Sequence, residues 1–94
     1  MQSFLVERRL RDVHERLVRA REELAVLDEQ LRVVVEDAED ARIRSLVSET
    51  PLAGHDYSEV RRHADAMTRA RTAMSAKVDD LERRQNELLA RVGS

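Results

Sequence analysis

The side chains able to do acid–base chemistry or to bind metals are few, and their spacing fits no familiar site. Three histidines titrate near neutral pH: His14, His55 and His63. His63 follows Glu59 by four residues, whereas helical di-iron sites need the three-residue spacing Glu-x-x-His. The chain has no cysteine, which excludes disulfides and cysteine zinc sites. We therefore expect no metal and no cofactor.

Nucleophilic catalysis has equally little support. Ser45, Ser48 and Ser58 gather near a predicted turn, but serine favours helix ends for hydrogen-bonding reasons alone. The two glycines, Gly54 and Gly93, are too few for a nucleophile elbow or a phosphate-binding loop. Aromatic residues make up only 2% of the chain, so an enzyme-sized pocket is hard to line. The sequence predicts a protein that is not an enzyme.

The charge balance and the apolar runs limit the kinds of partner that we expect the protein to bind. With 17 basic and 19 acidic residues the formal net charge is −2, and no positive field favours nucleic acid. Arginines in the first half alternate with acidic residues, which is typical of a mixed solvated surface. Strongly apolar runs such as Val33–Val35 are far below the roughly 20 residues that span a bilayer. The apolar start, Met1–Val6, is too short for a signal peptide. We expect a cytoplasmic protein without membrane or nucleic-acid partners.

Apolar residues recur at alternating spacings of four and three in both halves of the chain, which is the pattern of coiled-coil helices. We call this line of residues the seam, and it predicts helices over about residues 3–48 and 56–92. In the first helix the seam is Val6, Leu10, Val13, Leu17, Ala20, Leu24, Leu27, Leu31, Val34, Ala38 and Ala41. In the second it is Tyr57, Val60, Ala64, Met67, Arg71, Met74, Val78, Leu81, Gln85, Leu88 and Val92. Its two polar members either fix the register or extend to solvent.

Local signals place the turn between the helices at residues 49–55. Asp56, with Glu59 three residues later, has the spacing of a capping box at the start of the second helix. Pro51 disfavours continuation of the first helix. Alternatively, Thr50 caps a single helical turn that begins at Pro51 and ends at Gly54.

These elements predict one all-α domain over residues 1–94, with two long antiparallel helices forming a helical hairpin, or coiled coil. Folding at the turn places Leu24 near Asp79 and Ala38 near Asp65. A two-helix hairpin buries one stripe per helix, and this barely exceeds the cost of ordering the backbone. We therefore expect a homo-oligomer, with a dimer forming a four-helix bundle favoured, or docking on an unidentified protein partner.

Apolar residues outside the seam and the methionines within it are the predicted interaction surface. Small side chains in the second helix would allow a partner helix to approach closely. The predicted interaction residues are Val33, Val35, Ala66, Met67, Ala70, Ala73 and Met74. A non-enzymatic coiled-coil interaction or adaptor protein is the function this surface favours.

Acidic residues offer an alternative function. The segment Asp37–Ala41 looks like an Asp-x-x-Asp motif, and the hairpin resembles the secondary-channel class of bacterial transcription factors. That resemblance implies a regulator that docks its hairpin on RNA polymerase, with acidic tip residues near the catalytic magnesium. The cluster stands about nine residues before the turn, roughly 14 Å along the helix, and Asp56 and Glu59 lie nearer the tip. Secreted helical hairpins with a Trp-x-Gly turn are a further match in architecture, but the turn here reads Leu52-Ala53-Gly54.

Two segments resemble small uncharacterised helical-hairpin proteins of actinobacteria. The first runs from Thr50-Pro51 through Asp56–Met67, and the second is Leu81–Leu89. The resemblance covers roughly residues 50–92 and implies a cytosolic protein of that group. It implies no activity and carries no functional residues across.

Overall fold

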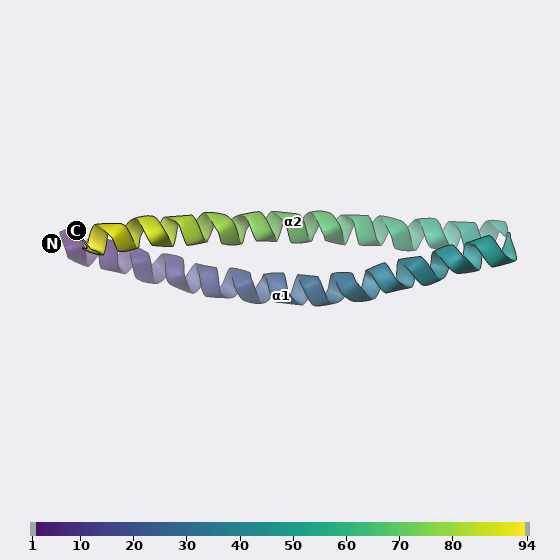
Figure 1. Cartoon of the computed structure of the whole chain (residues 1–94), viewed down its shortest axis with the longest axis horizontal. Coiled ribbons are helices and arrows are strands. Elements are labelled where there is room, and N and C mark those ends of the chain that lie inside the picture. The colour runs from purple at the N-terminus through teal and green to yellow at the C-terminus, as the bar shows by residue number, and fades with distance from the viewer. Residues whose placement is uncertain (1, 94) are drawn as a thin grey trace. The chain divides into compact units, whose positions relative to one another are not determined.

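The computed structural model describes the backbone of residues 2–93 and the side chains of residues 4–93. Two helices make up nearly all of this range: α1 (Gln2–Ser48, 47 residues) and α2 (Pro51–Gly93, 43 residues) (Figure 1). No strand occurs in the described backbone, so the all-α prediction is confirmed there. Within residues 2–93, neither helix contains a stretch both long and apolar enough to cross a bilayer.

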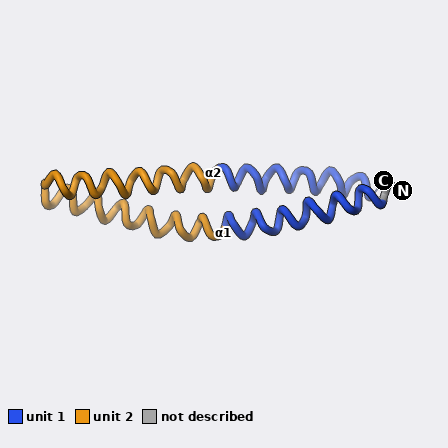
Figure 2. The backbone as a smooth tube through the Cα atoms, turned by 180° about the vertical axis from the view of Figure 1, so that it is seen from behind, with its two compact units in different colours: residues 1–24, 73–94 blue, residues 25–72 orange. Residues whose placement is uncertain are grey.

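The chain divides into two compact units, each containing part of both helices (Figure 2). Unit 1 comprises Met1–Leu24 and Ala73–Ser94, and unit 2 comprises Ala25–Thr72, including the turn. Inside each unit the two helical segments run antiparallel, as a hairpin requires. A contact across the helices marks each unit: Arg21 with Glu82 in unit 1, and Asp28 with Arg71 in unit 2.

The predicted seam is the buried line of both helices. In α1 every seam position from Val6 to Ala41 is buried or half-buried, and every other residue between Phe4 and Arg44 is exposed. In α2 the seam is covered from Tyr57 to Leu88, while Val92 is 42% exposed. The alternation of three and four residues keeps these side chains on one face of each helix, which is why the sequence pattern predicts burial. The core of unit 1 comprises Leu17, Ala20, Val78 and Leu81, with Val13, Leu24 and Met74 packed against it.

The turn is shorter than predicted, because α2 begins at Pro51 rather than at Asp56. Between residues 2 and 93, only Glu49 and Thr50 lie outside the helices. Thr50 caps α2: its Oγ1 accepts a hydrogen bond from the amide of Ala53 at 3.2 Å, which satisfies a donor that the first turn leaves free. Glu49 adopts a φ of 51°, and its amide donates to the carbonyl of Ser45 at 3.1 Å, closing α1.

The prediction that Gly54 ends a single helical turn, or that Asp56 caps the helix, is therefore wrong. Gly54 is helical, with its amide donating to the carbonyl of Thr50 at 3.1 Å, and α2 continues through both residues. A glycine inside a helix costs about 1 kcal/mol relative to alanine, and the cap at Thr50 offsets a cost of that size. A two-residue turn also moves the pairing of the helices.

The register is shifted by four residues from the predicted one at two of the contacts between the helices. The predicted pairing would place Asp28 opposite Ser75, yet Asp28 contacts Arg71. His14 likewise meets Gln85, four residues earlier in α2 than predicted. The shorter turn moves its midpoint toward the N-terminus, which accounts for the direction of this shift. The contact of Arg21 with Glu82 keeps the predicted pairing, so the shift differs from one contact to the next.

Candidate functional site

The predicted interaction residues divide into exposed and half-buried groups. Ala66, Ala70 and Ala73 are exposed on α2, and Val33 and Val35 are exposed on α1. The two methionines belong to the seam, where both are half-buried. Met74 packs against the buried core of unit 1, so its main contacts lie within the chain. Met67 lies in unit 2 and lines a groove there.

This groove of unit 2 is lined by two of the predicted interaction residues. It is open, has a volume of about 620 Å³, and lies between α1 and α2. Val33 and Met67 line it together with His63. Ala66 and Ala70 follow His63 by three and seven residues, which places them on the same side of α2. The residues lining the groove are Leu27, Glu29, Gln30, Val33, Val34, His63 and Met67.

We call this side of unit 2 the groove face. On α1 it follows the spacing 26, 30, 33, 37, which keeps four side chains on one flank of the helix. On α2 it follows 63, 66, 70. Its members are Val26, Gln30, Val33 and Asp37 of α1 and His63, Ala66 and Ala70 of α2. The structure therefore brings three predicted residues, Val33, Ala66 and Ala70, to one surface beside Met67.

Val35 does not share this surface, although both Val33 and Val35 are predicted interaction residues. Two residues along a helix correspond to a rotation of about 200°, so Val33 and Val35 leave α1 on opposite flanks. Val35 comes seven residues after Asp28 and shares its flank. That flank carries the ion pair in which Arg71 Nε donates to Asp28 Oδ1 at 2.7 Å. The two valines cannot contact the same partner face.

Both polar members of the seam make hydrogen bonds across the helices. Arg71 bonds Asp28 in unit 2, and His14 Nδ1 donates to Gln85 Oε1 at 3.0 Å in unit 1. The carboxylate of Asp28 raises the pKa of Arg71, first through the hydrogen bond and then through its charge. The side chain of Arg71 remains 39% exposed while it is bonded. These contacts favour a role for Arg71 and Gln85 in fixing the register of the two helices. The second contact also gives His14 a hydrogen-bond partner within the chain.

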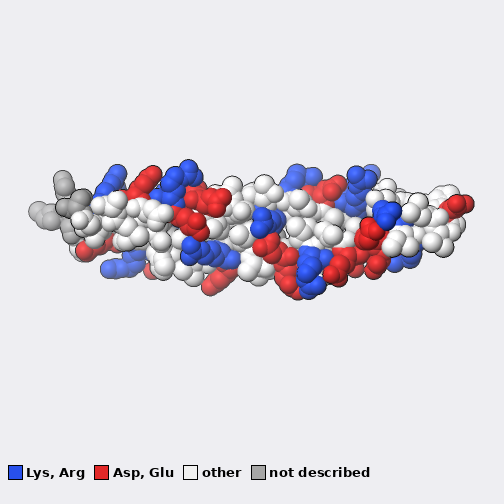
Figure 3. Space-filling model, in the orientation of Figure 1, with Lys and Arg blue, Asp and Glu red and all other residues white. Residues whose placement is uncertain are grey.

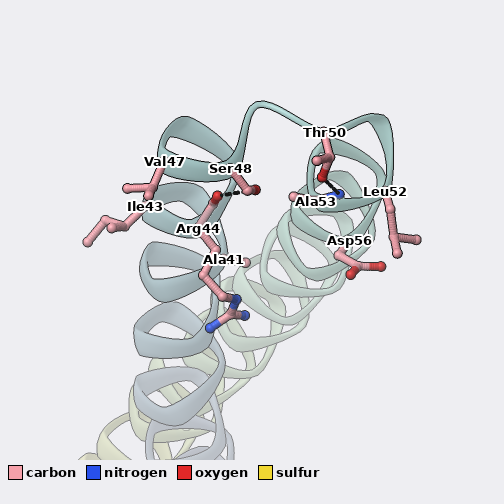
Figure 4. Close-up of a pocket in the computed structure, with 9 residues that line it drawn as sticks. All are labelled: Ala41, Ile43, Arg44, Val47, Ser48, Thr50, Leu52, Ala53 and Asp56. Atoms are coloured by element: carbon pink, nitrogen blue, oxygen red, sulfur yellow. Dashed lines mark hydrogen bonds between the residues drawn. The ribbon is translucent and has the colours of Figure 1, made fainter.

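The turn end of unit 2 carries large exposed apolar side chains. A second groove of about 390 Å³ lies beside the turn and is lined by side chains of both helices (Figure 4). Val47 is 80% exposed and Leu52 is 70% exposed, and Ile43 is exposed beside Val47. Asp56 is the acidic residue lining this groove. On the face shown in Figure 3, charged side chains interleave along the helices, whereas the end with the turn is mostly uncharged.

The acidic segment of α1 is partly neutralised within its own helix. Arg42 donates to Glu39 at 2.6 Å, and this hydrogen bond, ahead of the charge of Arg42, holds the pKa of Glu39 below its usual value. Arg32 donates to Glu36 at 3.4 Å. Asp37 and Asp40 make no ion pair with any residue that the structure describes.

Arginines from both ends of the chain meet in unit 1, a site that sequence reasoning missed. A groove of about 320 Å³ is lined by Arg9 and Arg16 of α1 and by Arg84 and Arg91 of α2. Asp12 and Glu87 also line this groove, and Arg84 is paired with Asp80 at 3.1 Å. The α1 arginines are visible in the sequence, but only the antiparallel packing adds those of α2.

The histidines are dispersed, and they do not form a metal site. His63 lies at the groove face, His14 bonds Gln85, and His55 is exposed near the start of α2. Across the described residues, no three histidine, aspartate or glutamate side chains are arranged to hold a metal ion.

Comparison with known proteins finds no family model, no curated protein and no solved structure that matches this chain, so its resemblance to actinobacterial hairpins stays a prediction.

Proposed function

We propose that the protein is a non-enzymatic coiled-coil interaction protein that associates with itself in the cytoplasm, as a dimer forming a four-helix bundle. One observation carries the proposal: large apolar side chains outside the seam are exposed in both units. Leu5 and Val18 are examples in unit 1, and Val26 and Val33 are examples in unit 2. Among the described residues, the largest fully buried side chains are Leu17 and Leu81.

Two helices packed only against each other bury little apolar surface. Ordering one residue of backbone costs about 1–2 kcal/mol, whereas burial contributes about 25 cal/mol per Å² of apolar surface. Each helix here buries one stripe. A second hairpin laid against the first would cover exposed valines and alanines, as in four-helix bundles. Self-association therefore supplies burial that the single chain lacks.

The test is the mass and the thermal stability of the full chain over a range of concentrations. Sedimentation equilibrium at roughly 1–100 µM should give twice the 10.9 kDa chain mass. Because association stabilises the folded state by mass action, the melting temperature should rise with concentration. A folded monomer with a constant melting temperature across this range would overturn the proposal.

A second candidate function is docking of the turn end on a larger protein such as RNA polymerase. The apolar groove beside the turn favours it, since Val47 and Leu52 are exposed there and Asp56 supplies a charge. Glu59, also near this end, is paired with Arg62 at 3.4 Å.

Binding of the purified chain to RNA polymerase, measured by interferometry, tests this second candidate. The double variant D56N/E59Q should weaken binding about tenfold or more if tip charges meet the polymerase. The pair D12N/E15Q, exposed in unit 1 and with the same three-residue spacing, is the matched control and should bind as the native chain does. Absence of binding by the native chain would remove this candidate.

A further inference from the structure

Val33 of α1 and Ala66 of α2 lie at the same height in unit 2. The ion pair between Asp28 and Arg71 marks a level at which the two helices meet. Val33 comes five residues after Asp28, and Ala66 comes five residues before Arg71. Because the helices are antiparallel, both steps lead toward the turn by about 7.5 Å. The two side chains thus form one row across the groove face.

The side chains on the α1 side of the groove face protrude further than those on the α2 side. We call these two sides the raised edge and the lowered edge. Val26 and Val33 form the raised edge on α1, with branched side chains that are 55% and 44% exposed. Ala66 and Ala70 form the lowered edge on α2, with only a methyl group each. Protein interfaces pack densely, so two such faces fit when the raised edge of one meets the lowered edge of the other. Stacking valine on valine and alanine on alanine would leave a gap along α2.

Two polar side chains of the groove face, Asp37 and His63, fit the same arrangement. Glu29 is the carboxylate that lines the groove, and Arg32 is bonded to it at 2.6 Å. Toward the turn, Asp37 makes no ion pair with the described residues. His63 lies within about one residue of the height of Asp37, on the other helix. When α1 of one copy covers α2 of another, the imidazole N–H of His63 can reach the carboxylate of Asp37.

We infer that the groove face binds the groove face of a second copy of this chain, with both turns at the same end. The two-fold axis of this dimer runs parallel to the helices, so α1 of each copy covers α2 of the other. Rotation about this axis does not change the position of a residue along the helix axis. Val33 of one copy then packs against Ala66 of the other, and Asp37 lies against His63. This inference rests on the proposed self-association and names its surface and orientation.

The test uses disulfide crosslinking, for which the chain is suited because it has no cysteine. Full-length V33C and A66C, distinguished by a tag on one of them, are mixed in denaturant, refolded together and oxidised in a glutathione buffer. The mixed crosslinked dimer should exceed either self-crosslinked dimer at least fivefold. Val33 and Ala66 are both exposed in the single chain, so these variants should fold, and circular dichroism verifies this.

The control replaces V33C by V35C, whose side chain leaves α1 on the opposite flank, and the mixed dimer should disappear. Two results would overturn the inference while leaving self-association intact: self-crosslinked V33C or A66C as the main product, or a dimer by sedimentation in which no pair crosslinks. A monomeric native chain by sedimentation would instead overturn the proposed function itself.

Discussion

Arg71 Nε donates a hydrogen bond to Asp28 Oδ1 at 2.7 Å, and this pair joins α2 to α1 in unit 2. Arg71 occupies a seam position, where apolar side chains are the rule. In unit 1, Gln85 occupies another seam position and accepts a hydrogen bond from His14. Each unit therefore contains one polar seam residue that selects its partner on the opposite helix. A shift of one seam position would break both contacts, which is how such residues specify register.

Replacing Arg71 by leucine removes a residue that fixes the register, and we do not expect it to lower the stability of the fold. The apolar side chain fills a seam position without desolvating a charge, so we expect unfolding stability to be unchanged or higher. D28L leaves Arg71 without its partner and should be less stable than R71L. Urea denaturation of both variants measures the difference, and a clear loss of stability in R71L would contradict the expectation.

Truncating the two most buried leucines should be costly. L17A and L81A each remove a fully buried side chain from the core of unit 1, and we expect about 2–5 kcal/mol of lost stability for each. L46A is the matched control, because Leu46 is exposed and should change stability by less than about 0.5 kcal/mol. Denaturant unfolding at one fixed protein concentration provides the comparison. Similar effects at buried and exposed positions would contradict the seam as the core.

The cap of α2 can be assigned by mutation. T50A removes the hydroxyl oxygen that accepts from the amide of Ala53, and should cost about 0.5–2 kcal/mol. T50S keeps the oxygen and should recover most of that loss. D56A should be close to neutral, because Asp56 lies inside the helix rather than at its cap. If D56A were the costly variant in thermal melts, α2 would begin later than Pro51.

The pairing of Glu39 with Arg42 predicts a pH effect with a defined sign. The hydrogen bond from Arg42 lowers the pKa of Glu39 in the folded chain relative to the unfolded chain. A lowered folded pKa stabilises the protein at pH values above the unfolded pKa, and the contribution is lost as pH falls through the folded pKa. Carboxyl-detected NMR titration should show the low pKa of Glu39, and R42A should return it to the ordinary range. An unchanged pKa in R42A would contradict the pairing.

The turn shows where sequence reasoning was limited by competing local signals. Pro51 correctly indicated that α1 stops before it, and Thr50 as a cap was one of the two arrangements considered. Gly54 and Asp56 were interpreted as an end and a start, because glycine often ends helices and aspartate often caps them. In the structure Gly54 is half-buried near Ser45, where an added Cβ would lie 3.8 Å from its hydroxyl oxygen. A methyl group at this position would therefore make an ordinary van der Waals contact, and the helix does not require glycine there.

The sequence by itself determined the two helices and the line of side chains that each buries. Those features depend on spacing within one segment, and the alternation from Val6 to Ala41 has no other regular interpretation. Only the tertiary structure decided which flanks share a surface, so that Val33 joins His63 at the groove face while Val35 shares its flank with Asp28. Relative rotation and stagger of two helices depend on the turn length and on contacts between residues distant in the chain. A turn of two residues therefore set the register that no local pattern contains.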